Sequence, residues 1–244
     1  MTNKKETALV PFQKQYPVLY SDMQEIKKSI EENLGGETFS QFDLPRVPMP
    51  QGKNGSFAFT DLAGNEVSEK ELNGIIIAFK STRQYYLSPD PSNEPPDCWS
   101  EDAITGAGIR SKDQKEPSAM ACLQCPLSAW NTSEKGKGQA CSSRKVLFIL
   151  LPGAQLPYVL SLSPGSLKNF KTFQTRLVMN SLYYYGVQTT LTCEKAESGG
   201  IVYQKVVFNA EKLDNESLLK AYEYHKLFAP TLVNTSVKPE TSEE

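Results

Sequence analysis

Four of the five cysteines in the chain fall between residues 98 and 141, in the pattern C-x23-C-x2-C-x15-C. The middle pair has the spacing at which two thiolates from one tight turn reach the same ion, and the outer two can complete a tetrahedral site. The residues between them are rich in glycine and polar side chains, so a metal ion would supply the folding energy of this segment. We therefore predict a structural metal site at Cys98, Cys122, Cys125 and Cys141. Zinc is favoured, and thiolate ligation alone leaves an iron–sulfur cluster open.

The remaining cysteine and the start of the chain bear on its compartment. An odd number of cysteines argues against a disulfide framework, and Cys193 fits a buried thiol on a strand. Met1 is followed by polar residues and lysines rather than by an apolar stretch, so we expect no secretory signal. No apolar run approaches the roughly 18 residues of a membrane span, so we expect no membrane partner.

Charge is unevenly distributed along the chain. The total of 26 Lys and Arg against 28 Asp and Glu gives a net charge of -2. The stretch from Lys135 to Cys193 nevertheless holds seven bases and no acid. A purely basic quarter of an otherwise acidic protein favours an anion-binding face.

Hydrophobic patterning predicts a mainly β, α+β protein. We expect a helix over 21–34 capped by Ser21, strands over 73–87, 145–151 and 158–162, and a helix that begins at Ser163. A hairpin over 187–193 and 201–208 and a helix over 214–228 follow. This order predicts an OB-fold-like small barrel with a four-cysteine insertion and flanking helices. The expected parts are an N-terminal extension (1–43), the OB-like core (44–97 and 142–230), the insertion (98–141) and a flexible acidic tail (231–244).

OB-folds bind single strands with a basic groove and aromatic platforms. Strand alternation places Arg83 with Tyr85 on one face and Tyr86 with Lys80 on the other, and pairs Tyr203 with Lys205. The predicted nucleic-acid-binding residues are Lys80, Arg83, Tyr85, Tyr86, Arg144, Lys168, Lys171, Arg176, Tyr203 and Lys205.

Several stretches resemble a poorly characterised family of proteins from phages, prophages and integrative elements. They are Leu44–Pro50, Pro95–Cys98, Asp102–Gly106, Cys122–Pro126, Gly136–Cys141, Arg144–Phe148, Leu156–Ser163 and Ser166–Lys168. The resemblance covers about residues 44–210, and it implies single-strand binding in the cytoplasm of a bacterial host. By architecture the chain is also similar to the zinc-containing OB-fold single-strand-binding proteins of T-even phages, although their ligands include histidine.

The sequence thus predicts a single-stranded DNA-binding protein of phage or mobile-element type with little sequence preference. The acidic tail could recruit replication or recombination proteins, and the oligomeric state is left open. The first alternative is a protein–protein adaptor of phage replication or transcription that uses the zinc segment. A metal-dependent nuclease is less favoured, although Asp97, Asp113 and Lys115 formally match its pattern. With His225 as the only histidine, we expect no enzyme and no catalytic residues.

Overall fold

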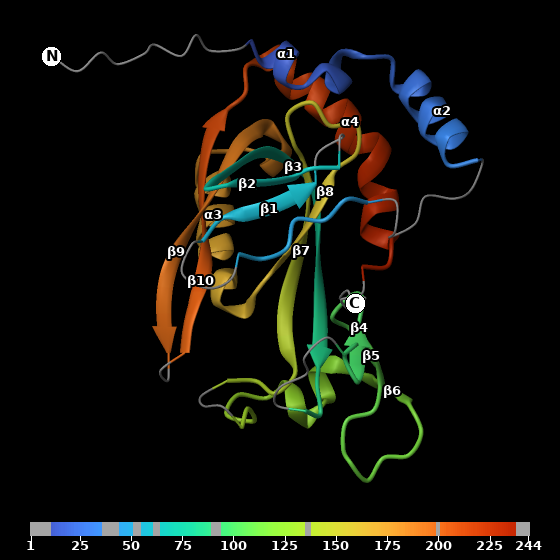
Figure 1. Cartoon of the computed structure of the whole chain (residues 1–244), viewed down its shortest axis with the longest axis vertical. Helices are drawn as coiled ribbons and strands as arrows, with labels where there is room; N and C mark the ends of the chain where they lie inside the picture. Colours follow the sequence, from blue (N-terminus) through green and yellow to red (C-terminus); the bar gives the residue numbers. More distant parts are fainter. Residues whose placement is uncertain are drawn as a thin grey trace, which may run out of the picture.

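The computed structural model describes residues 11–35, 44–50, 55–60, 64–88, 94–134, 138–198 and 201–237 (Figure 1). The helices in these ranges are α1 (Phe12–Gln15), α2 (Met23–Asn33), α3 (Leu167–Met179) and α4 (Asn215–Asn234). Short 3-10 helices are η1 (Pro17–Tyr20), η3 (Cys122–Gln124), η4 (Pro126–Ser128), η5 (Pro164–Ser166) and η6 (Tyr184–Gly186). The strands are β1 (Phe57–Thr60), β2 (Glu66–Glu69), β3 (Glu71–Tyr85), β4 (Cys98–Ser100), β5 (Thr105–Gly108), β6 (Ser118–Ala121), β7 (Ser142–Leu150), β8 (Tyr158–Leu162), β9 (Val187–Ser198) and β10 (Ile201–Lys212).

The long strand β3 joins all parts of the main sheet. Its first four residues pair with β9, its body pairs with β7, and Arg83–Tyr85 pair with β4. A β-bulge at Ile77 shifts the register with β7, because Ile76 faces Ile149 while Ala78 faces Phe148. Bulges bend and twist a strand, and β3 turns from the β9–β10 hairpin toward β4 in Figure 1.

The centre of the sheet is buried on both faces. Alternate residues of β7 belong to two different cores, with Val146, Phe148 and Leu150 on one side and Leu147 and Ile149 on the other. The first core packs against η1, α2 and α4, and the second packs against α3 and the β9–β10 hairpin. This arrangement explains why the β7 sequence is continuously apolar instead of alternating.

The described strands form a mainly β structure with flanking helices, as predicted, but they do not close into a barrel. The path runs β10–β9–β3–β4–β5–β6, with β7 and β8 branching from β3. Closure would require β8 to meet β10, and each of these edges is hydrogen-bonded at one residue to another segment. Pro45 and Val47 exchange backbone hydrogen bonds with Val159 of β8, while Ser166 and Asn169 bond to Val206 of β10.

The ends of the described chain differ in part from expectation. Asp22, not Ser21, caps α2 by accepting hydrogen bonds from the backbone N–H groups of Gln24 and Glu25. Asp214, where the last helix was expected to begin, caps α4, but α4 continues to Asn234, and Ala229 and Leu232 are buried. The helix therefore extends into the expected tail, and tail residues 238–244 lie outside the described ranges.

Candidate nucleic-acid interface and four-cysteine cluster

Basic side chains gather on the α3 side of the sheet, near the end of β3. Beyond the bulge, Phe79, Ser81 and Arg83 point to this side, because Phe79 packs against Phe170 of α3. Lys145 of β7 lies opposite Ser81, and its Nζ donates to Ser81 Oγ over 2.6 Å and lies 5.5 Å from the centroid of the Phe79 ring. Burial lowers the pKa of Lys145, and the charge of Lys171 on α3 lowers it further. The charge of Lys171 on α3 therefore acts on Lys145.

The helix η5 extends this basic surface to β10, because it packs against both β7 and β10. A Cβ at Gly165 would lie 2.6 Å from Tyr203 Cε2 and 3.7 Å from Lys205 Cγ. Only glycine lets these two side chains approach the helix so closely. Lys205 Nζ lies 5.7 Å from the centroid of the Tyr203 ring, so the charge and the aromatic ring form one unit.

We call this surface the basic face and define it by six residues, five of which were predicted. Arg83 donates to Ser143 Oγ at 2.9 Å, and Lys168 and Lys171 are exposed one turn apart on α3. In the part of the chain that the structure describes, none of its basic groups forms an ion pair with a carboxylate. The members of the basic face are Arg83, Lys145, Lys168, Lys171, Tyr203 and Lys205, of which all but Lys145 were predicted as candidates.

The other predicted residues lie elsewhere. Arg144 and Lys80 point to the α4 side of the sheet, and burial lowers the pKa of Arg144, whose Nε is buried without a hydrogen-bond partner. Burial also raises the pKa of Tyr86 beside Arg144. Arg176 donates to the backbone carbonyl of Phe208 on β10. Tyr85 lies beside the four cysteines, where burial raises its pKa.

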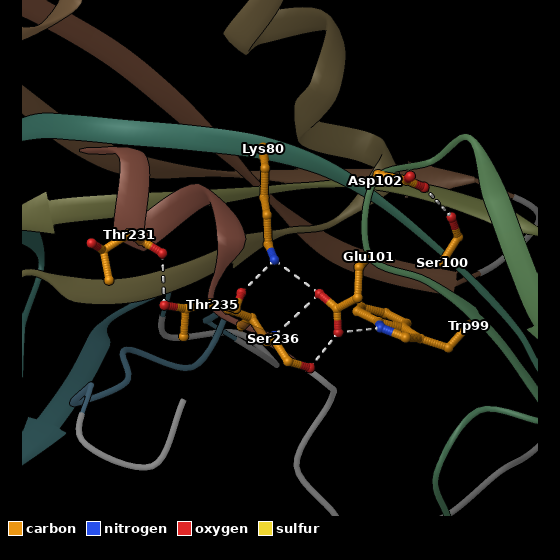
Figure 2. Close-up of polar contacts among 9 residues, drawn as sticks. Lys80, Trp99, Ser100, Glu101, Asp102, Thr231, Thr235 and Ser236 are labelled. Carbon is orange, nitrogen blue, oxygen red and sulfur yellow. Dashed lines mark hydrogen bonds and ion pairs between the residues drawn. The ribbon is translucent and has the colours of Figure 1, made fainter. Parts of the chain in front are cut away.

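Lys80 is engaged by the protein itself. Figure 2 shows its Nζ between Glu101 and the backbone carbonyl of Thr235, at 2.8 Å and 2.6 Å. Glu101 also accepts hydrogen bonds from Trp99 Nε1 and Ser236 Oγ. This cluster fastens the end of α4 to β3 and β4, so Lys80 is not a free phosphate contact.

The four predicted metal ligands lie at the end of β3 that pairs with β4 and with the start of β7: Cys98 pairs with Tyr85, and Cys141 directly precedes β7. A Cβ at Gly106 would lie 3.3 Å from the sulfur of Cys98 and 3.5 Å from that of Cys122. Burial raises the pKa of Cys141 to about 11, and the charges of the other three cysteines add to this effect. Burial also raises the pKa of Cys98, opposed by Arg110 and reinforced by Cys125 and Cys122.

Backbone hydrogen bonds hold the cysteines in place. The N–H of Cys122 donates to Ile104 O at 2.7 Å, and the N–H of Cys141 donates to Leu127 O at 2.9 Å. Ser128 Oγ donates to the carbonyls of Cys122 and Cys125, at 2.6 Å and 2.8 Å. The C-x2-C turn is therefore closed by a serine hydroxyl rather than by a regular helix.

The sulfurs are free thiols, and Cys193 lies apart from them on β9. Across the described ranges, no three His, Cys, Asp or Glu side chains are arranged closely enough to hold a metal ion. The donor set itself suits zinc, because thiolates are soft ligands and four of them form a closed structural site. Ligation would require the sulfurs to draw closer and to lose their protons.

The two carboxylates of the nuclease pattern, Asp97 and Asp113, do not form a site together. Asp97 Oδ2 accepts the backbone N–H of Leu87 at 2.7 Å, which closes the connection between β3 and β4. Asp113 is exposed on the loop before β6, and neither carboxylate belongs to a cation-binding group among the placed residues. Lys135 and Lys137 of the acid-free stretch lie outside the described residues.

Sequence reasoning missed the side chains that secure the basic face. Ser166 Oγ accepts the buried N–H of Val206 at 3.0 Å, and Asn169 Nδ2 donates to the Val206 carbonyl at 3.0 Å. Gln139 links Arg83 to the cysteine turn, because it accepts from Arg83 at 3.4 Å and donates to Ser128 O. The order of elements gives no signal for such contacts, since they depend on how α3 crosses β10.

Comparison with known proteins adds no relative: no family model, no curated protein and no solved structure matches the chain. No described helix is long and apolar enough to cross a membrane.

Proposed function

We propose that this protein binds single-stranded DNA through the basic face. One observation carries the proposal. In the described ranges, none of the cations of this face forms an ion pair with a carboxylate, although Glu194 of β9 lies opposite Lys205 in the strand register. The charge of Lys171 also lowers the pKa of Lys145. Cations that gather without ion-pair partners favour a polyanion as the missing partner.

Aromatic groups beside these charges favour a single strand over a duplex. Tyr203 lies next to Lys205 on β10, with the lysine Nζ 5.7 Å from the centroid of the ring. Unpaired bases stack on such rings, whereas bases in a duplex are already stacked on each other. Stacking needs no particular base, so we expect little sequence preference.

The test is a fluorescence anisotropy titration with labelled oligo-dT at two salt concentrations, with the matching duplex and oligo-U as controls. We expect binding to oligo-dT that weakens steeply with salt, and binding to the duplex that is at least about tenfold weaker. Equal binding to duplex and single strand would refute the stacking component. Tighter binding to oligo-U would reassign the ligand to RNA.

A second candidate, a protein–protein adaptor, is favoured by the surface of the cysteine segment. Leu123 is 94% exposed and Trp130 is 71% exposed, and Ile104 is also largely exposed. Exposed apolar side chains that gather on one segment are typical of interaction sites. A folded protein without affinity for any oligonucleotide at low salt would favour the adaptor. Under our proposal, replacing Leu123 and Trp130 with serine leaves oligo-dT affinity within about twofold.

A further inference from the structure

We propose that Cys98, Cys122, Cys125 and Cys141 bind one zinc ion, and that this ion forms the core of the segment 98–141. The proposal is independent of the nucleic-acid ligand, because it concerns how one part of the chain folds.

The burial pattern of this segment is the first argument. Among its described residues, the only buried ones are Cys98, Ser100, Gly106, Cys122 and Cys141. Its large apolar side chains face outward instead. The interior of the segment therefore consists of sulfur atoms and small groups, and burying them yields little hydrophobic stabilisation. A metal ion bound by these sulfurs is the interaction that stabilises such a fold.

The secondary structure around the sulfurs is the second argument. The segment consists of the short strands β4, β5 and β6 and two single-turn 3-10 helices. Three-residue and four-residue strands have little stability of their own. Cys98 begins β4, Cys122 begins η3, Cys125 lies between η3 and η4, and Cys141 directly precedes β7. One ion would therefore fasten β4, the C-x2-C turn and the start of β7 together.

Glycine at position 106 is the third argument. Gly106 is buried on β5, and the sulfurs of Cys98 and Cys122 approach its Cα side from two different elements. A Cβ at this position would be tight against the Cys98 sulfur at 3.3 Å and in ordinary contact with the Cys122 sulfur at 3.5 Å, so a small residue suits the site. Two of the four sulfurs therefore lie against the same small residue.

The charge around the sulfurs suits four thiolates and a divalent ion, which together carry a charge of about -2. Arg110 Nη1 lies 3.8 Å from the sulfur of Cys98, and Arg110 is fixed by its bond to Ser118 O at 2.7 Å. Arg83 approaches from β3 through Gln139. Both guanidinium groups offset the charge of the bound site, and the thiol protons pass to solvent as the metal binds.

The test measures metal directly in the full-length protein. Elemental analysis after expression with zinc should give about one zinc per chain, and replacement by Co²⁺ should give the absorption bands of tetrahedral thiolate ligation. The double variant Cys122→Ser/Cys125→Ser should contain at least about tenfold less zinc per chain than wild type. Cys193→Ser is the matched control and should keep it, because Cys193 lies on β9.

A second measurement covers the case in which the double variant does not fold. Chelation of wild-type protein should speed proteolysis within 98–141 while β3, β7 and α4 stay protected. Wild-type protein that binds neither zinc nor cobalt would overturn the proposal. So would iron with acid-labile sulfide in place of zinc, or loss of zinc in Cys193→Ser.

Discussion

Lys80 and Glu101 form an ion pair in which Nζ lies 2.8 Å from Oε2 and only 8% of the lysine side chain is exposed. The same Nζ donates to Thr235 O, so one buried cation joins the central strand, the cysteine segment and the end of α4. This cluster shows why a lysine that alternation assigns to a ligand-binding face can instead be structural.

Replacing the carboxylate with an amide should destabilise the fold. Glu101→Gln leaves Lys80 buried without its charge partner, which should lower the free energy of unfolding by about 1–3 kcal/mol. Urea denaturation measures the change. The control is Lys220→Gln, because the exposed Lys220–Glu223 pair should contribute less than about 1 kcal/mol. Equal losses in the two variants would contradict a buried role for the Lys80–Glu101 pair.

The same pair should make stability depend on pH. Burial raises the pKa of Glu101, but hydrogen bonds from Lys80, Ser236 and Trp99 outweigh it and hold the pKa below the ordinary 4.5. A carboxyl with a lowered pKa stabilises the fold above that ordinary value, and the contribution is lost as pH falls through the folded pKa. Urea denaturation of wild type and Glu101→Gln from pH 7 to about pH 3 should therefore show their difference shrinking below 4.5. A difference in unfolding free energy between wild type and Glu101→Gln that stays constant with pH would contradict a lowered pKa for Glu101.

Ser166 should contribute to stability through the edge of β10. Ser166→Ala leaves the buried N–H of Val206 without its acceptor and should cost about 1–3 kcal/mol of unfolding free energy. Thr175→Ala on the exposed side of α3 is the control and should change it by less than about 0.5 kcal/mol. If Ser166→Ala matches the control, the bond between η5 and β10 is not what secures this edge.

Tyr203 should contribute a base-stacking ring. Tyr203→Ala should weaken oligo-dT binding by about tenfold, because stacking on one ring contributes about 1–3 kcal/mol per base. Tyr203→Phe keeps the ring and should bind within about twofold of wild type. Urea denaturation of both variants separates loss of binding from loss of folding. A folded Tyr203→Ala variant with wild-type affinity would remove Tyr203 from the interface.

The sequence predicted most of the regular structure, because alternation and caps are local signals. β8 spans 158–162 as expected, and the hairpin of β9 and β10 starts at Val187 and Ile201 as predicted but continues beyond 193 and 208. Local signals could not predict whether the sheet closes into a barrel, because closure depends on which strand edges meet in space. Pro45, Val47 and Ser166 hydrogen-bond to those edges through contacts with no sequence signature.

The candidate site was predicted unevenly for a similar reason. Alternation correctly separated Arg83 from Lys80, but it could not reveal that Glu101 would reach Lys80. Lys145 was absent from the predicted interface because it directly precedes the buried apolar run of β7. The β3–β7 register, which places Lys145 opposite Ser81, and the packing of α3, which carries Lys171, are long-range features.

The most direct test of the central claim compares the salt dependence of oligo-dT binding between wild type and Lys145→Gln/Lys171→Gln. The double variant should bind more weakly, and the slope of log affinity against log salt should become shallower by about 0.7 for each lost phosphate contact. Lys27→Gln/Lys28→Gln is the matched control, because both lysines lie on α2 beside Glu31 and Glu32, away from the basic face. An unchanged slope in the folded Lys145 and Lys171 variant, or the same loss in the control, would contradict the proposal that the basic face binds the DNA backbone.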